Sequence, residues 1–193
     1  MRLHLIRHSQ TLVPPGMCYG SSDVAVSSSE RDAVLQVLIP NLPHGAPLFS
    51  SPLQRCASLA EPLAQALHGG PVHYDARLAE MHFGDWEMCA WDQIAQAAID
   101  AWAAQPVDYR PGGGESVLQM AQRIRACYQD LRLLAVPDLI VICHAGSIRL
   151  LQAALHASSA NGMAHLAAAT PHAIAYGSVS VLDLTDTAAP PQT

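Results

Sequence analysis

The run DLIVIC, residues 138–143, constrains the fold more than any other stretch of the sequence. It is apolar almost throughout, without the alternation of a strand that faces water on one side, as is typical of a central strand in a parallel sheet. A second apolar run, RLHLI (2–6), opens the chain, and PLFSS (47–51) and VHYD (72–75) are shorter candidates. We therefore expect buried strands at these four places.

Helical patterns separate these strands. Ser27 and Glu30 have the spacing of a capping box, and the apolar residues that follow recur at helical spacing for about three turns. A second helix is expected from Pro52 until Gly69 and Gly70, because proline suits a first helical turn and glycine ends helices. Three more helices are expected over residues 90–104, 117–135 and 146–156, and an extended segment over about 173–184.

The alternation of strands and helices predicts a three-layer α/β/α fold with a mostly parallel central sheet. At 193 residues, with 50% hydrophobic and 13% charged residues, the chain suits one such domain with a sizeable core. We predict a single domain over residues 1–184, followed by the polar C-terminal tail TDTAAPPQT, residues 185–193. In sheets of this kind ligands bind beyond the carboxyl ends of the strands, so functional residues are expected there.

The composition excludes several kinds of chemistry. All 10 basic residues are arginines, so the chain has no lysine for a P-loop, a Schiff base or a general base. A formal net charge of −6 argues against a nucleic-acid partner, which a basic surface would bind. Five scattered cysteines, without a CxxC pair, indicate neither a disulfide framework nor a thiolate zinc site. Any phosphate group would therefore be bound by arginine, histidine and backbone amides.

The sequence also lacks recognisable targeting and metal-binding signals. No apolar stretch approaches the roughly 18 residues that a membrane span needs, and the N-terminus does not resemble a signal peptide. His68 with His73, and His165 with His172, do not have the spacing of metal ligands. We therefore expect a cytoplasmic protein with no membrane partner and no metal site.

Polar side chains of similar chemistry follow three of the predicted strands. Arg7 and His8 come directly after the first strand, Arg55 lies in the first turn after the second, and His144 follows DLIVIC. Because parallel strands end at the same edge of a sheet, these four side chains are expected to lie together. Glu80, in the loop-like stretch LAEMHFGDWE, is the carboxylate candidate for this site.

This set of side chains suits phosphoryl transfer. Two arginines neutralise most of the charge of a phosphomonoester, and a neutral imidazole is a competent nucleophile toward phosphorus. A second imidazole can hydrogen-bond the equatorial oxygens as charge develops, and a protonated Glu80 can donate a proton to the leaving alcohol. Glu87 and Asp85 lie close enough in the sequence to compete with Glu80 for that role.

Other conspicuous side chains are expected to have structural roles. We interpret His4, in the first strand, as a hydrogen-bonded structural histidine, and Glu87 as a support of the site. Trp86, Trp91 and Trp102 are expected in the core or in the wall of a pocket. None of them is therefore assigned to the chemistry.

Four segments in order, LIRHSQT, SSPLQRC, LAEMHFGDWE and VICHAGSIR, resemble the signature segments of the histidine phosphatase superfamily, which has the phosphoglycerate-mutase-like fold. The similarity extends over about residues 2–184. Within the superfamily, RLHLIRH, GMCYGSSDV and EMHFGDWE look most like the α-ribazole phosphatases of cobalamin nucleotide-loop assembly. The resemblance implies a phosphomonoesterase that forms a phosphohistidine, acts on α-ribazole 5'-phosphate as its small-molecule substrate, and uses no metal or other cofactor.

The resemblance also implies roles for individual residues. It makes His8 the nucleophile and Glu80 the proton donor, which then activates the water that releases phosphate. Arg7, Arg55 and His144 match the phosphate pocket. The residues expected to contact substrate are Ser9, Thr11, Tyr19, Gly20, Glu115, Ser116 and Ala145.

The sequence departs from the family pattern beside the nucleophile. Ser9 stands where relatives usually have glycine, and Gln10 stands where glutamate is common. The Cβ of serine can crowd a backbone that phosphate approaches, while its hydroxyl can donate to that phosphate. Pro14 and Pro15 stand near the place of an asparagine, so one donor of the pocket is lost or replaced.

Three alternatives to an α-ribazole phosphatase stay open. The first is a broad-specificity phosphatase for sugar or nucleotide phosphates. The second is a phosphoglycerate mutase, although mutases of this family are longer and use inserted segments to keep water from the phosphohistidine. The third is a catalytically weak phospho-ligand-binding protein, in which Ser9 marks lost turnover. A serine hydrolase would need a GxSxG elbow, and HSQT at residues 8–11 offers none.

Overall fold

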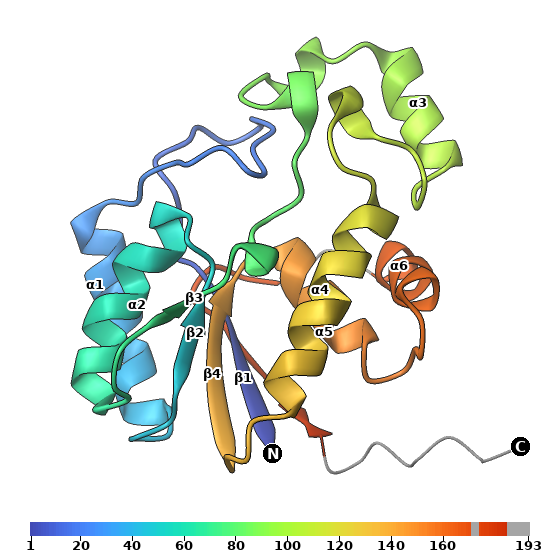
Figure 1. The fold of residues 1–193 in the computed structure, drawn as a ribbon. Helices are drawn as coiled ribbons and strands as arrows, with labels where there is room; N and C mark the ends of the chain where they lie inside the picture. Colours follow the sequence, from blue (N-terminus) through green and yellow to red (C-terminus); the bar gives the residue numbers. More distant parts are fainter. Residues whose placement is uncertain (171–173, 185–193) are drawn as a thin grey trace, which may run out of the picture.

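The computed structural model describes residues 1–170 and 174–184, and over these residues the chain forms a five-stranded sheet in the order β3-β2-β4-β1-β5 (Figure 1). The strands are β1 (Arg2–Arg7), β2 (Leu48–Ser50), β3 (His73–Tyr74), β4 (Asp138–Cys143) and β5 (Val179–Asp183). The first four pair in parallel, and β5 runs antiparallel beside β1. The predicted mostly parallel sheet is thus confirmed, with strands at all four expected places.

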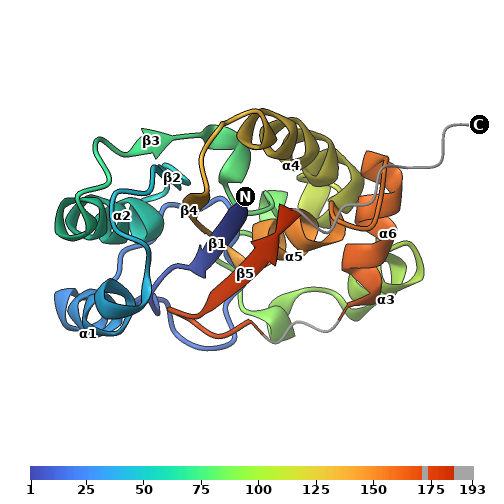
Figure 2. The same cartoon turned by 90° about the horizontal axis from the view of Figure 1, so that it is seen from below.

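Helices cover both faces of the sheet (Figure 2). The helices α1 (Ser28–Leu38) and α2 (Gln54–Leu67) lie on one face, and α4 (Val117–Arg132), α5 (Ala145–Ala153) and α6 (Ala160–Ala169) lie on the other. Helix α3 (Gln96–Ala104) stands beyond the carboxyl edge of the sheet (Figure 1). Short 3₁₀ helices are η1 (Ile39–Asn41), η2 (Ala76–Leu78), η3 (Gly84–Trp86), η4 (Trp91–Gln93) and η5 (Pro111–Gly113). The three-layer α/β/α arrangement is confirmed.

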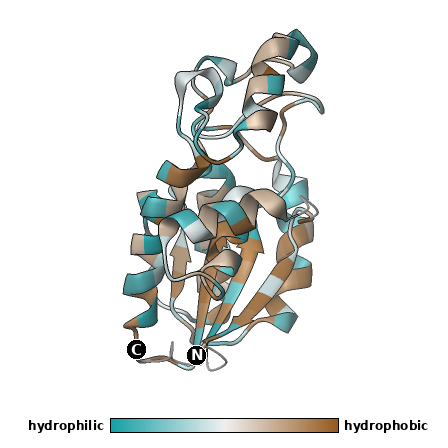
Figure 3. Cartoon of the chain, turned by 90° about the vertical axis from the view of Figure 1, so that its right-hand side faces the viewer, coloured by the Kyte–Doolittle hydropathy of each residue, from teal (hydrophilic) through white to brown (hydrophobic). Residues whose placement is uncertain are grey.

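The apolar run of β4, which follows Asp138, is explained by the two cores that it joins. All six of its residues are buried. Ile140 and Ile142 face the core under α2, whereas Leu139 and Val141 face the core under α4, α5 and α6. Successive side chains of a strand point to opposite faces, so a strand covered on both sides needs apolar residues at every position. Each such side chain contributes about 1.5–3 kcal/mol by its burial. Figure 3 shows the apolar strands between the helix layers.

The register of the strands brings their following residues together. Arg7, the last residue of β1, pairs with Cys143, the last residue of β4. The N–H of His8 continues the ladder to the carbonyl of Cys143 at 3.1 Å, and that of Ser51 donates to Ile142 at 2.9 Å. The residues just beyond β1, β2 and β4 therefore emerge at one carboxyl edge, as the sequence predicts.

Side-chain caps explain where several helices begin. The Ser27 hydroxyl accepts a hydrogen bond from the N–H of Glu30 at 3.2 Å, at the start of α1. Ser116 and Gln119 form a complete capping box at the start of α4. These polar groups satisfy backbone N–H groups that have no partner within the helix.

The end of α2 differs from its prediction. The helix ends at Leu67, and His68 rather than a glycine takes the left-handed conformation that closes it, with φ of +55°. The N–H of His68 bonds the carbonyl of Gln65 at 3.3 Å, and Gly69 bonds Ala64 at 3.0 Å. The left-handed conformation costs a non-glycine residue about 1–2 kcal/mol, and these two hydrogen bonds at the end of the helix offset part of that cost.

Three other segments also differ from expectation. Residues 90–104 form η4 and α3 rather than one helix. The sequence pattern does not indicate helix α6, although the Ser159 hydroxyl caps it by accepting from the N–H of Gly162 at 3.1 Å. The final extended segment forms β5 only from Val179. Residue 173 and the predicted tail, 185–193, lie outside the described residues, so the division at residue 184 stays a prediction. No helix in the described part of the chain is long and apolar enough to cross a membrane.

Candidate active site

His8 lies just beyond β1 and is only 3% exposed. Its Nδ1 is 2.7 Å from the carbonyl oxygen of Ser9, which can only accept, so Nδ1 carries the proton and Nε2 the free lone pair. Burial and the positive charges of Arg55 and Arg7 lower the pKa of His8 to about 3. The imidazole is therefore neutral near pH 7, with Nε2 available as a nucleophile.

His144 lies directly after β4, fully buried, with its ring centroid 5.1 Å from that of His8. Its Nδ1 accepts from Nε of Arg55 at 3.1 Å, so its Nε2 carries the proton and lies 2.8 Å from the Ser51 hydroxyl. Burial, followed by the charge of Arg55, lowers the pKa of His144 well below its usual value. Neutral His144 thus orients Arg55 through Nδ1. For Nε2 of His144 to donate to a phosphate oxygen, its hydrogen bond to the Ser51 hydroxyl has to break.

Arg55, in the first turn of α2, is 1% exposed and is held in a fixed orientation. Besides its bond to His144, it donates to the carbonyls of Ser22 at 2.7 Å and Gly20 at 2.5 Å. A guanidinium has five N–H groups, so these three bonds leave two N–H groups for a ligand. Arg55 thus links the edge of the sheet to the loop over residues 20–22.

Arg7 supplies the second cation of the site. Its Nη1 donates to the carbonyl of Ile174, and its guanidinium carbon lies 3.8 Å from the ring centroid of Tyr176. Within the described residues, the buried Nε of Arg7 and hydroxyl of Ser9 have no hydrogen-bond partner, and neither Arg7 nor Arg55 pairs with a carboxylate. Cations without a counterion and unpaired donors beside His8 are what an anion site requires.

Glu87 shapes the loop that Arg55 contacts. Its carboxylate accepts from the backbone N–H groups of Gly20, Ser21 and Ser22 at 3.0 Å each, and of Phe83 at 2.8 Å. Burial alone would raise the pKa of Glu87, but these hydrogen bonds and that of the Ser22 hydroxyl outweigh it and lower the pKa to about 2. Glu87 is therefore an ionised structural anchor, as expected, and is not available as an acid.

Glu80 is held in place by backbone amides. Its Oε1 accepts from the N–H of Met81 and its Oε2 from the N–H of Gly146, both at 3.0 Å. A Cβ on Gly146 would lie 2.2 Å from Oε1, so glycine at this position makes room for the carboxylate. Asp85, the other candidate acid, is exposed. The geometry therefore favours Glu80 as the carboxylate of the site.

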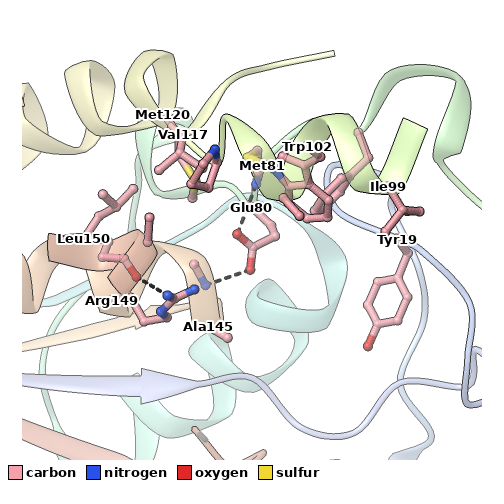
Figure 4. A pocket seen from close by; sticks show the side chains of 16 residues that line it. Tyr19, Glu80, Met81, Ile99, Trp102, Val117, Met120, Ala145, Arg149 and Leu150 are labelled. Carbon is pink, nitrogen blue, oxygen red and sulfur yellow. Dashed lines mark hydrogen bonds between the residues drawn. The ribbon is translucent and has the colours of Figure 1, made fainter. Parts of the chain in front are cut away.

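A pocket of about 430 Å³ lies beside Glu80 (Figure 4). Its polar side chains are Tyr19, Glu80 and Arg149. The rest of the lining is apolar and includes Met81, Phe83, Ile99, Trp102, Met120 and Leu150. These residues come from α3, α4, α5 and the loop before η3, so the pocket is built largely by the helices rather than by the strand ends. Such a lining suits a ligand with a large apolar part.

An aromatic cluster fixes α3 over this pocket. Trp102 of α3 stacks on Trp91, with centroids 6.2 Å apart and planes at 13°. It meets the rings of Trp86 at 5.8 Å and Phe83 at 5.9 Å, edge to face or nearly so. Such pairs contribute about 0.5–1.5 kcal/mol each beyond their buried area. The tryptophans therefore form the wall and support of the pocket, as expected.

The structure places the predicted substrate residues in different surroundings. Tyr19 and Ala145 line the pocket together with Glu80. Ser9 lies next to the nucleophile, and the carbonyl of Gly20 is bound by Arg55. Tyr19 and Ala145 thus belong to the pocket, whereas Ser9 and Gly20 belong to the surroundings of His8 and Arg55.

The other three predicted substrate residues have local partners. Thr11 is buried and forms an isolated antiparallel bridge. The Ser116 hydroxyl caps α4, and both carboxylate oxygens of Glu115 accept from Arg123. Glu115 also lines a second pocket, which it shares with Glu80. Contact of these residues with substrate stays a prediction.

Several residues of the site were missed from the sequence. Arg149 lines the pocket and donates to the carbonyls of Ala167 and Thr170. Tyr176 lies 5.5 Å from the ring of His8, and its hydroxyl is 2.7 Å from that of Tyr19. Arg149 falls within VICHAGSIR, where its charge was a usable signal, whereas Tyr176 lies in a segment with no motif.

Comparisons with known proteins agree on one family. A family model described as the histidine phosphatase superfamily (branch 1) matches residues 3–189. The chain is 32% identical over 168 residues to a glucosyl-3-phosphoglycerate phosphatase of Mycolicibacterium vanbaalenii, covering 80% of this chain and 73% of that one. It is 26% identical over 172 residues to an adenosylcobalamin/alpha-ribazole phosphatase of Salmonella typhimurium, covering 86% and 84%. The crystal structure of the alpha-ribazole phosphatase of Shigella flexneri superposes with a TM-score of 0.78 at 26% identity, covering 97% and 92%.

Proposed function

Because the chain belongs to the histidine phosphatase superfamily and is a phosphoric monoester hydrolase, we propose that it works through a phosphohistidine on His8 and hydrolyses α-ribazole 5'-phosphate in cobalamin nucleotide-loop assembly. One observation carries the proposal: a neutral His8, with Nε2 unprotonated, feels the positive charges of Arg55 and Arg7, which have no carboxylate partner in the described chain. A cytoplasmic location is part of the proposal, since all five cysteines are free thiols.

In the first step Nε2 of His8 attacks phosphorus and the bond to the ester oxygen breaks. Arg7 and Arg55 bind the phosphoryl oxygens and offset the charge that develops on them. Glu80, in its protonated form, gives its proton to the leaving oxygen, so that an alcohol rather than an alkoxide departs. The products are the free alcohol, a phosphohistidine and an ionised Glu80.

In the second step the same carboxylate accepts a proton from water, which attacks the phosphohistidine. Inorganic phosphate leaves, and His8 returns to its neutral form while Glu80 is protonated again. Because the acid of the first step is the base of the second, one carboxylate suffices for the cycle. The bonds from Met81 and Gly146 hold the Glu80 carboxylate in the wall of the pocket where the alcohol lies.

The lining of the pocket supports the choice of substrate. The alcohol part of α-ribazole phosphate is a ribose that carries a dimethylbenzimidazole, which is a flat and largely apolar ring system. Trp102, Ile99 and Met120 offer an apolar wall of matching character beside Glu80. A general phosphatase for polar sugar phosphates would have no use for so much apolar surface.

Glucosyl-3-phosphoglycerate is the second candidate. The mycobacterial phosphatase named for it has the higher identity of the two curated relatives compared, 32% against 26%. Arg149, in the same pocket as Glu80, is a cation that can pair with the glycerate carboxylate. The sugar, however, would have to lie against apolar side chains.

A comparison of kcat/KM for purified protein decides between these substrates. The panel consists of α-ribazole 5'-phosphate, glucosyl-3-phosphoglycerate, a hexose phosphate and a nucleoside monophosphate, assayed by phosphate release in EDTA. We expect kcat/KM to be highest for α-ribazole phosphate, by at least about tenfold, which corresponds to about 1.4 kcal/mol of additional binding free energy. If it ranks below the sugar or nucleotide esters, the cobalamin assignment is wrong. Phosphate binding without release from any ester would indicate a binding protein, and faster transfer to phosphoglycerate than to water would indicate a mutase.

A further inference from the structure

The segment that carries Glu80 has little secondary structure, yet its backbone is tightly held by one side chain of α4. Nη1 of Arg123 donates to the carbonyls of Arg77 at 2.6 Å and Ala79 at 2.7 Å, and Nη2 donates to the carbonyl of Glu80 itself at 3.2 Å. One guanidinium therefore fixes three carbonyls within four residues, ending at the residue that bears the carboxylate.

Helix α5 holds the same segment from another direction. The hydroxyl of Ser147 donates to the carbonyl of Leu78 at 2.9 Å and to that of Ala79 at 3.2 Å. The neighbouring N–H of Gly146 donates to Oε2 of Glu80. All four carbonyls over residues 77–80 thus accept a hydrogen bond from a side chain of α4 or α5.

Glu115 completes the coordination of Arg123. Its two oxygens accept from Nε and Nη2 of Arg123, both at 2.8 Å, in the bidentate geometry that suits a guanidinium and a carboxylate. With the three carbonyls, this gives every one of the five N–H groups of Arg123 an acceptor. Both side chains are largely buried, with 22% and 18% exposed. A lysine has the charge of arginine but not this planar fork, so it cannot make the same set of bonds.

We propose that Arg123, oriented by Glu115, is a positioning residue that places the Glu80 carboxylate against the leaving oxygen of the substrate. The inference rests on the proposed function, because it presupposes that Glu80 is the acid. Arg123 touches the backbone of Glu80 and not its carboxylate, so it acts through the position of the segment. A misplacement of about 1 Å in a reacting group can cost on the order of 100-fold in rate. In this proposal the role of Glu115 is to hold the guanidinium of Arg123 in its orientation.

The test compares two esters that differ in their need for an acid. The alcohol of β-glycerophosphate leaves poorly without a proton, whereas p-nitrophenolate leaves readily, and kcat/KM reports the steps up to that departure. For Arg123→Lys we expect kcat/KM to fall by at least about 10-fold on β-glycerophosphate and by less than about threefold on p-nitrophenyl phosphate. Arg132→Lys, the same change at an exposed arginine of α4, is the matched control and should leave both values unchanged.

Glu115→Gln is a milder second variant, since it keeps one acceptor for Arg123 and loses the charge. It should show the same split between the two esters, with the thermal midpoint of each variant measured alongside. Equal losses on both esters would mean that Arg123 only supports the fold, and no loss on either would mean that Glu80 needs no support; both results overturn the inference. A higher KM on both esters for Glu115→Gln alone would place Glu115 on the substrate.

Glu80→Gln separates the inference from the proposed function. If Glu80 is the acid, this variant shows the largest split, and adding Arg123→Lys to it produces little further loss on β-glycerophosphate. If Glu80→Gln loses activity equally on both esters, Glu80 is not the acid and there is nothing for Arg123 to position. If Glu80→Gln shows the split, but the losses of Glu80→Gln and Arg123→Lys multiply in the double variant, Glu80 remains the acid and the positioning role of Arg123 is refuted.

Discussion

The phosphate site and the pocket beside it are built in different ways. The phosphate site uses residues that directly follow β1 and β4 or start the helix after β2, and the parallel register alone brings His8, His144 and Arg55 together. The pocket uses side chains from α3, α4, α5 and α6, elements whose relative positions depend on packing. The site around His8 therefore depends on short motifs at strand ends, whereas the pocket depends on how the helices assemble.

The two regions meet at Glu80 and at the loop over residues 20–22. Glu80 lies in the wall of the pocket and is bonded to Gly146, two residues after His144. In the loop, Gly20 accepts from Arg55 while its neighbour Tyr19 lines the pocket. A change in the phosphate site should therefore affect every ester, and a change in the pocket should affect only esters with a matching alcohol. Substitutions in each region test this division.

The largest effect is expected from His8→Ala. Loss of the nucleophile should reduce kcat/KM by at least about 1000-fold on every ester, including p-nitrophenyl phosphate, because no phosphohistidine can form. His156→Ala, a change at an exposed histidine of no assigned role, is the control and should leave the rate unchanged. Substantial activity of His8→Ala on any ester would break the claim that one phosphate site serves them all.

A charge placed in the pocket should act selectively. Ile99→Asp puts a carboxylate in the apolar wall of the pocket. Binding of the apolar ring of α-ribazole phosphate would remove this carboxylate from water, at a cost of about 1.5–3 kcal/mol, so we expect kcat/KM for this ester to fall by about 10- to 100-fold. The small ester β-glycerophosphate should change little. Ala97→Asp adds the same charge to an exposed position of the same helix and serves as the control. An equal loss on both esters would mean that the pocket is not separate from the phosphate site.

Much of the fold, and the meeting of His8, His144 and Arg55 at one edge of the sheet, could be predicted from the sequence, because the apolar runs and the residues after them are local signals. DLIVIC is apolar since both of its faces are covered, and His144 follows it directly. The pocket could not be predicted in the same way. Its wall depends on α3, which the pattern over residues 90–104 did not separate from η4, and on α6, whose alanine-rich sequence has little amphipathic contrast.

The missed arginines illustrate the same limit. Arg123 lies on an amphipathic helix, where a charged residue is usually solvated, and nothing in its sequence neighbourhood indicates five acceptors. Arg149 lies one turn into α5 and reaches the pocket only because α6 packs beside it. The partners of both side chains are distant in sequence, so their roles emerge only from the packed structure.

The shared loop should show a smaller, pH-dependent effect. Glu87 has a pKa of about 2 in the folded protein against an ordinary value of 4.5, so its contribution to stability is fully present above about pH 4.5 and is lost as the pH falls toward 2. Glu87→Gln should lower the thermal midpoint at neutral pH, and its difference from the wild type should shrink at acid pH. Thermal unfolding followed by circular dichroism measures this, and a pH-independent difference would contradict the role of the ionised carboxylate.

The smallest effect is expected from Ser9→Gly, which restores the residue that relatives usually have. The Ser9 hydroxyl is buried and has no hydrogen-bond partner in the described chain, so its removal leaves no group unsatisfied. We expect kcat/KM to stay within about threefold of the wild type on all esters. A loss of more than tenfold would mean that the hydroxyl donates to phosphate, and a comparable gain would mean that its Cβ crowds the phosphate.

The central claim, a phosphoryl group carried by His8, can be observed directly. The protein is mixed with p-nitrophenyl phosphate, and the reaction is quenched in alkali, in which phosphohistidine survives. The quenched protein is then digested, and its peptides are measured by mass spectrometry. The account predicts a phosphoryl group on the peptide that contains His8 in the wild type, and none in His8→Ala. A phosphoryl group on another residue, or rapid turnover with no phosphorylated peptide at any quench time, would contradict it.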